Sequence, residues 1–345
     1  MKSEQNHLSK KDAKSFEGNP VLLYISKFRE LGLLAFILCI SFIIQLRNPA
    51  FLTIDNLSDM ITNTAILSIL AVGMMLVIVT RGIDLSVGST IGLSGMIVAQ
   101  IVSANSDLPP VVAILIGIGI GAICGLLIGS LVSKLKILPI IATLAAMFIF
   151  RGITFMVSDG SWVSAHQMPE QFLELGRGTF LGIHYLVWIA GAIYLFFYYF
   201  VNHLRLGRQI YAVGSNPESA KVSGISEAKI NFLVYSMMGA LAGLSGVLWV
   251  AKFASAQGDT ATGFEMNVIA ACILGGVSIS GGSGKVSGVL MGSLLIGILN
   301  NALPLIGVSA FWQMGIQGFI ILTAVIANTY VKRSVDKGRL LRRQI

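Results

Sequence analysis

The chain has 345 residues, of which 55% are hydrophobic and 12% are charged, and its formal net charge at pH 7 is +8. A soluble domain carries about twice that share of charged residues, so the composition excludes an ordinary soluble protein and indicates a polytopic membrane protein. The positive charge does not indicate nucleic-acid binding, because the lysines and arginines collect in short polar segments between apolar tracts and at the chain ends.

The first 30 residues are polar, carry four lysines before Ser15, and lack an apolar core that ends in small residues. No cleavable signal peptide is therefore predicted. We expect residues 1–30 to form a cytoplasmic segment, 31–331 a single transmembrane domain, and 332–345 a basic cytoplasmic tail. The cysteines Cys39, Cys124 and Cys272 all lie in apolar stretches, without metal-ligand spacing, and are interpreted as packing residues.

The apolar tracts predict an all-α, polytopic fold with about ten transmembrane helices, since roughly 20 apolar residues are needed to cross a bilayer. The helices are expected at 31–46, 61–80, 87–104, 111–132, 137–157, 183–203, 231–252, 266–280, 286–305 and 311–331. With both termini in the cytoplasm, most of the 24 lysines and arginines fall on the inner side, which supports this orientation over its inverse.

The first break in the apolar pattern is "LVIVTRGIDLSVGST", which places Arg81, Asp84, Ser86 and Gly88 within an apolar tract. A charge at mid-bilayer costs about 2.5 to 3.5 kcal/mol on insertion scales, so Arg81 and Asp84 need partners or water. We expect a non-helical joint that shapes a transport path. The alternative is an ordinary cytoplasmic turn, with Arg81 at the interface and Asp84 capping the next helix.

A second break, "LGGVSISGGSGKVSG", contains Gly275 and Gly276. Interrupted segments in both halves of a membrane protein indicate a translocation path, although a tight cytoplasmic turn is again the alternative. The stretch is not a phosphate-binding loop, because Ile279 and Val286 occupy positions where that motif needs glycine and serine or threonine.

Glycines recur at four-residue spacing in the predicted helix 111–132, and such a ladder lets a second helix backbone approach closely. Close packing inside one subunit is favoured over a dimer interface. The glycines are Gly117, Gly121, Gly125 and Gly129, with further pairs at Gly239 and Gly243 and at Gly288 and Gly292.

The polar loop 204–230 contains "SNPESAKVSGI", which has the pattern of a short helix. Ser215 or Asn216 would cap it, Pro217 would take its first position, Glu218 would favour its positive end, and Gly224 would end it. The helix is either a docking element or a solvated loop helix. Two longer segments outside the membrane, "RNPAFLTIDNLSDM" and "SDGSWVSAHQMPEQFLELGRGTFLG", are expected to form short surface helices that either dock a partner or merely connect spans.

Several of these motifs, in this order, resemble the permease subunit of bacterial ribose-type ABC importers. They are "RGIDLSVGS", "GRQIYAVGSNPESAKVSGI" and the long stretch that begins "GFEMNVIAACILGGVSISGGSGKVSG". The resemblance runs from about Leu31 to Tyr330, and the family also includes permeases for other monosaccharides and for autoinducer-2. Most members of that family have a glycine where this chain has Arg81, which is expected to pair with Asp84 or to reach the cytoplasmic interface.

The resemblance implies a transport subunit of the bacterial inner membrane rather than an enzyme, with no cofactor or metal on this chain and ATP and Mg²⁺ bound by a partner. The implied partners are a cytoplasmic ABC ATPase, a periplasmic sugar-binding protein, membrane lipid and a second permease, with an identical copy favoured over a related one. It also implies an ATPase-coupling segment, with the expected core residues Gly214, Asn216, Glu218, Ala220 and Gly224.

Amides in the last two predicted spans are candidates for the substrate path, because they match sugar hydroxyls. They are Asn300, Asn301, Gln313 and Gln317. Hydrogen bonds between neighbouring helices are the more common use of such amides, and Arg151 is likewise expected to pair across helices.

Two other functions remain as alternatives. A stand-alone secondary carrier needs intramembrane carboxylates for a coupling ion. Asp84 is the only acid that the predicted spans place outside the loops. An intramembrane enzyme needs a catalytic or metal-binding cluster, which the predicted spans do not offer.

Overall fold

The structure is a computed structural model, and it describes residues 29–309, 312–313, 315–316, 318–319, 322–323 and 326. Within this part of the chain, the polypeptide forms mostly α-helices. The long helices are α3 (Arg29–Arg47), α4 (Ile54–Val79), α5 (Val87–Ala104), α6 (Pro110–Ser133), α7 (Pro139–Ser158), α9 (Tyr185–His203), α12 (Glu227–Phe253) and α14 (Val286–Leu305). The shorter ones are α8 (Glu170–Arg177), α10 (Arg205–Ser215), α11 (Pro217–Val222) and α13 (Phe264–Leu274), with 3₁₀ turns at Pro49–Leu52 and Ala165–Gln167.

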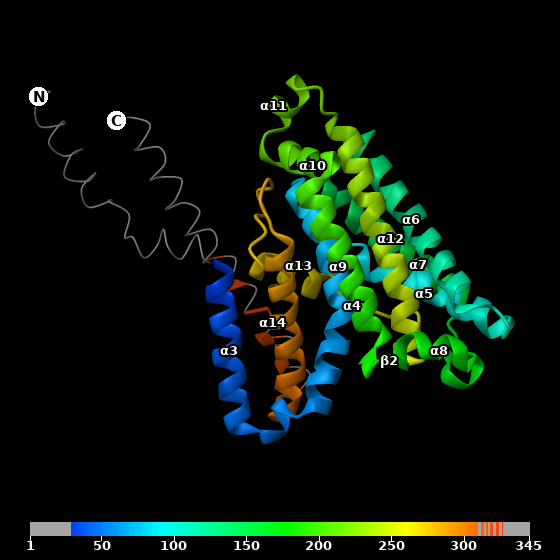
Figure 1. Cartoon of the computed structure of the whole chain (residues 1–345). Helices are drawn as coiled ribbons and strands as arrows, with labels where there is room; N and C mark the ends of the chain where they lie inside the picture. Colours follow the sequence, from blue (N-terminus) through cyan, green and yellow to red (C-terminus); the bar gives the residue numbers. More distant parts are fainter. Residues whose placement is uncertain are drawn as a thin grey trace, which may run out of the picture.

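The strands are two residues long and pair in two small antiparallel sheets. Strand β1 (Val163–Ser164) pairs with β4 (Ser255–Ala256), and β2 (Thr179–Phe180) pairs with β3 (Ile183–His184). The predicted all-α class is therefore confirmed. Figure 1 shows α10 and α11 at one end of the bundle and α8 with β2 at the opposite end.

The core sits around α4, α5 and α12, whose side chains are mostly buried. Helices α6, α7 and α9 pack around them, α3 packs on α14, and all four expose large apolar side chains such as Phe42, Leu115 and Phe148. Such an apolar surface is unfavourable in water and favourable in the hydrocarbon of a lipid bilayer. Among the described residues, eight helices are long and apolar enough to cross a membrane.

One predicted span is wrong in its extent. The sequence predicts a helix over 266–280, but α13 ends at Leu274 and its 11 residues reach about 16 Å, well short of a bilayer core of about 30 Å. The helix stops because Gly276 adopts a left-handed φ of 94° and the Val277 N–H turns back to the Cys272 carbonyl at 3.0 Å. The predicted span 311–331 lies largely outside the described residues.

Helix ends also differ from the predicted ones. Helix α4 begins at Ile54 rather than at 61, because Thr53 caps it by accepting a hydrogen bond from the Asn56 N–H. The first outer segment thus becomes a 3₁₀ turn and the start of α4, and the second contains the expected surface helix, α8. Helix α10 was not predicted from the sequence.

The glycine ladder packs α6 against α12 within one chain. A methyl group built on Gly121 would lie 2.6 Å from Gly243 Cα, and one on Gly125 would lie 3.1 Å from Gly239 Cα. The prediction that these glycines serve packing inside one subunit is confirmed. Helices α13 and α14 use the same device, since Gly288 leaves no room for a side chain against the carbonyl of Gly275.

Candidate helix joint and coupling segment

The segment between α4 and α5 is not helical, as the first break predicted. Helix α4 ends at Val79 and α5 begins at Val87, and the seven residues between them form turns and irregular backbone. Asp84 is only 2% exposed, and its Oδ1 accepts hydrogen bonds from the Ser86 N–H at 2.9 Å and the Ser86 hydroxyl at 2.6 Å. Since Ser86 directly precedes α5, these two hydrogen bonds from Ser86 to Asp84 hold the start of that helix.

Arg81 lies at the end of α4 and is exposed rather than embedded in the core. Its Nε donates to the Gly214 carbonyl and its Nη2 to the Ser215 carbonyl, both at 2.8 Å. Within the part of the chain described, no ion pair joins Arg81 to Asp84. Of the two alternatives for Arg81, pairing with Asp84 is therefore wrong, and the guanidinium binds the end of α10 instead.

The start of α5 packs closely on the chain that leads into α13. A methyl group on Gly88 would lie 2.5 Å from both the Ala261 carbonyl oxygen and the Glu265 Oε2 atom. Glu265 is 8% exposed and stands in the first turn of α13. It is a second buried acid that the sequence analysis missed, because the predicted span began one residue later. The signal was present, since Glu265 is an acid inside the apolar run "GFEMNVIAACIL".

Arg151 of α7 reaches the same region. Its Nη1 donates to the carbonyls of Gly258 and Thr260, each at 2.8 Å. The guanidinium thus satisfies backbone oxygens in the irregular segment before α13, where unpaired carbonyls would be costly. Arg151 pairs across elements, as predicted, but with backbone rather than with an acid side chain.

The second break forms a closed turn between α13 and α14. The Ser278 N–H donates to the Ser283 carbonyl at 2.9 Å, and the Gly281 N–H donates to the Ser278 carbonyl at 2.8 Å. Ile279 and Ser280 at its tip are exposed. Gly275 and Gly276, which precede the turn, end α13. The second break therefore has the geometry of a tight turn, which was the alternative to a path-shaping segment.

Helix α11 has the caps that its sequence predicts. The Asn216 Oδ1 accepts from the Ser219 N–H at 3.0 Å, and Pro217 is the first helical residue. At the other end, Gly224 takes a φ of 77° and its N–H donates to the Lys221 carbonyl at 3.0 Å. Both ends of this six-residue helix are therefore fixed by specific hydrogen bonds.

The expected coupling residues divide into an inner and an outer set. Gly214 and Ala220 are buried against the rest of the chain, while Glu218 is exposed. Val222, four residues further along the same helix, is 90% exposed. The sequence analysis missed Val222. The signal was an apolar residue on the same short helix as Glu218.

Two of the candidate path amides, Asn301 and Gln313, form hydrogen bonds within the chain. Asn301 and Asn56 exchange two side-chain hydrogen bonds at 3.0 and 3.1 Å, which join α14 to α4. Gln313 donates to the Val308 carbonyl at 3.0 Å, Asn300 is partly buried, and Gln317 lies outside the described residues. Asn301 thus forms hydrogen bonds between two helices, as the alternative predicted. The geometry does not require Asn301 to lie in the substrate path.

The chain combines apolar helices, a buried irregular joint and an organised helical loop at one polar end. These features define a multi-pass membrane transport protein. Residues 56–325 match the model of a family described as branched-chain amino acid transport system, permease component. The chain belongs to this permease family and is a multi-pass protein of the bacterial inner membrane.

Several characterised relatives align along most of the chain. The ribose import permease protein of Escherichia coli K12 is 42% identical over 83% of this chain and 89% of its own. That of Bacillus subtilis is 39% identical over 95% and 98%. The autoinducer 2 import system permease protein of Salmonella typhi is 31% identical over 94% and 92%. No solved structure matches the chain.

Proposed function

We propose that this chain is the permease subunit of an ATP-driven importer for a monosaccharide or a related small molecule, such as a ribose-type sugar or autoinducer-2. A periplasmic binding protein would deliver the substrate, and a separate cytoplasmic ATPase would bind ATP and Mg²⁺. The permease itself would carry no cofactor, and two copies would enclose the path. The names of the relatives support this function, and they do not support a stand-alone carrier.

The observation that carries the proposal is the form of α11. A six-residue helix would not hold its shape alone in water. Helix α11, however, has hydrogen-bonded caps at both ends and packs against the rest of the chain through its buried residue Ala220. It therefore presents Glu218 and Val222 on a preformed surface. A charged group and an apolar group held rigidly side by side suit docking into a groove of a partner protein.

Mechanism follows from differential binding. An ATPase that closes on ATP and opens after hydrolysis would displace α11 between two positions, and the permease would shift between outward-open and inward-open packings. The described helices offer few uncommitted amides for a sugar, which suits a path that binds its substrate weakly. The outer end that carries α8 would receive the binding protein.

The test is co-purification of the ATPase encoded beside this chain. Wild-type permease is expected to bring the ATPase down from detergent, and Glu218→Arg is expected to lose most of it, because the charge at the contact is reversed. Glu170→Arg is the matched control, since Glu170 is also an exposed first-turn acid, but of α8 at the opposite end.

Retention of the ATPase by Glu218→Arg to the level of Glu170→Arg would refute α11 as the docking element. Uptake of labelled ribose into liposomes by the purified chain alone, without ATP, would refute the importer and establish a carrier.

A further inference from the structure

Three segments that lie far apart in the sequence meet at the end of α4. The Gly282 N–H donates to the Val79 carbonyl at 2.9 Å. Gly214 of α10 packs so closely on the same carbonyl that a methyl group there would overlap its oxygen and lie 2.8 Å from the Gly282 nitrogen. The backbones of α4, α10 and the turn 278–283 are thus in direct contact, with no side chain between them.

The Arg81 side chain closes this junction. Its two hydrogen bonds go to the carbonyls of Gly214 and Ser215, the last two residues of α10. Carbonyls at a helix C-terminus lack helical donors and carry the negative end of the helix dipole, so a guanidinium with its fixed fork of donors suits them. The aliphatic part of Arg81 also packs on Gly281. The residue that follows Ser215 is Asn216, the cap of α11.

Arg81 itself stands on an unusual backbone. Its φ is 67°, in the left-handed region that glycine adopts freely and other residues adopt at a cost. An arginine is therefore present at a position where glycine would suit the backbone better. Replacement by glycine leaves this backbone relaxed and removes the whole side chain, so it tests what the Arg81 side chain does.

We propose that Arg81 is a positioning residue that fastens the coupling helix α11 to the end of α4 and makes movement of α11 act on the transmembrane helices. This rests on the proposed coupling function of α11. Helix α4 is buried along most of its length, so its end cannot move without its neighbours. Beyond Arg81, the chain passes through Asp84 and Ser86 into α5. A displacement of α11 is thus delivered to both sides of the non-helical joint.

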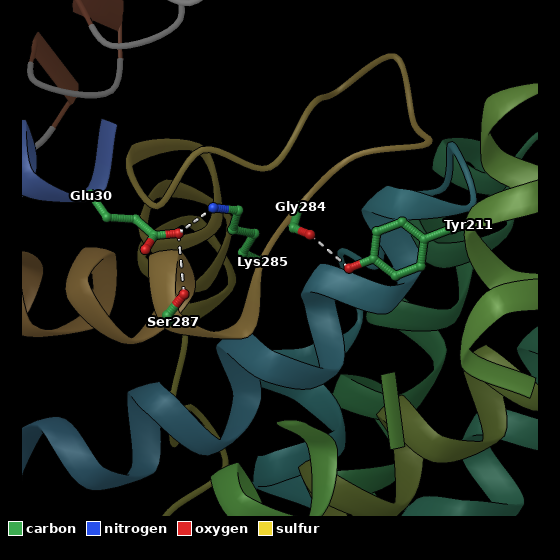
Figure 2. A network of polar contacts seen from close by, with 5 residues as sticks. All are labelled: Glu30, Tyr211, Gly284, Lys285 and Ser287. Atoms are coloured by element: carbon green, nitrogen blue, oxygen red, sulfur yellow. Dashed lines mark hydrogen bonds and ion pairs between the residues drawn. The ribbon is translucent and has the colours of Figure 1, made fainter. Parts of the chain in front are cut away.

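Two other contacts hold the chain just after this turn, and the second of them provides the control for a test. The Tyr211 hydroxyl donates to the Gly284 carbonyl at 2.7 Å, and burial raises the pKa of Tyr211 to about 12, so it stays a donor at neutral pH. On the other side, Lys285 and Ser287 both contact Glu30 of α3, at 3.0 and 3.2 Å (Figure 2). The Lys285–Glu30 ion pair is exposed, and exposed ion pairs contribute little to stability.

The experiment uses the complete transporter in proteoliposomes, with the ATPase and binding protein, and labelled ribose as the probe. ATP hydrolysis and uptake are measured for wild type, Arg81→Gly, Arg81→Lys and Glu30→Gln. For Arg81→Gly, we expect the ATPase to bind and hydrolyse ATP, while sugar transported per ATP falls about fivefold or more, as the loss of at least one net hydrogen bond implies. Arg81→Lys keeps the charge but donates from a single nitrogen, so it should recover part of the ratio, and Glu30→Gln should match wild type.

An unchanged transport ratio in Arg81→Gly overturns the inference and leaves the proposed function standing. A wild-type transporter that shows no ATP-dependent uptake of ribose, nor of arabinose or autoinducer-2 supplied in its place, overturns the proposed function, and the inference falls with it. If Arg81→Gly transports nothing, amide hydrogen exchange on the purified permease decides. Faster exchange confined to residues 205–225 and 278–285 supports the fastening role, whereas a general rise that includes α5 and α12 shows that Arg81 only supports the fold.

Discussion

The contact between α6 and α12 gives a direct prediction about stability. Gly121 faces α12 so closely that a methyl group there would lie 2.6 Å from both the nitrogen and the Cα of Gly243, whereas ordinary van der Waals contact begins at 3.4 Å. These are backbone atoms of a packed helix and cannot rotate away. Gly121→Ala must therefore push the two helices apart.

Gly119 provides the matched control on the same helix. A methyl group at Gly119 would meet no atom within 4 Å, so Gly119→Ala only gains helix propensity, about 0.5 to 1 kcal/mol. Gly121→Ala has the same gain but adds overpacking strain of about 1 to 3 kcal/mol. The propensity gain cancels in the comparison. The free energy of unfolding of Gly121→Ala should thus lie about 1 to 3 kcal/mol below that of Gly119→Ala.

The assay is reversible unfolding in mixed detergent micelles, followed by circular dichroism, with both variants in the same micelle composition. Equal unfolding midpoints for the two variants would refute the argument. They would show that the close contact between the α6 and α12 backbones does not require glycine at position 121. A thermal midpoint series on the two variants checks the same order independently.

The remaining predictions concern two asparagines. Asn301→Ala deprives Asn56 of a partner and should cost about 1 to 3 kcal/mol of stability, with ribose uptake preserved at matched expression; normal stability with lost uptake would instead place Asn301 in the substrate path. Asn216→Ala removes the acceptor for the Ser219 N–H and should destabilise α11 locally by about 1 kcal/mol. Amide exchange of residues 217–222 should then quicken, and Asn216→Asp, which keeps an acceptor, should restore protection.

The sequence by itself determined the features that depend on local composition and short spacing. Uninterrupted apolar tracts are long enough to cross a bilayer, and they predicted the helical membrane fold and most of its spans. The caps of α11 were also predictable, because Asn216, Pro217 and Gly224 act within one or two turns of the residues they hold. The glycine ladder predicted close packing, since its four-residue spacing puts the glycines on one helix face.

Only the tertiary structure decided which distant groups meet. Arg81 and Asp84 are three residues apart, and sequence proximity suggested that they pair. The left-handed backbone at Arg81 instead directs its side chain to Gly214 and Ser215, more than 130 residues away.

Glu265 was missed for a related reason. An acid inside an apolar run was visible in the sequence, but the contact with Gly88 of α5 that buries Glu265 was not. A hydrogen bond or a close packing contact depends on the positions of both partners. Local sequence fixes the conformation of each segment, whereas the packing of the whole bundle sets the distance between segments.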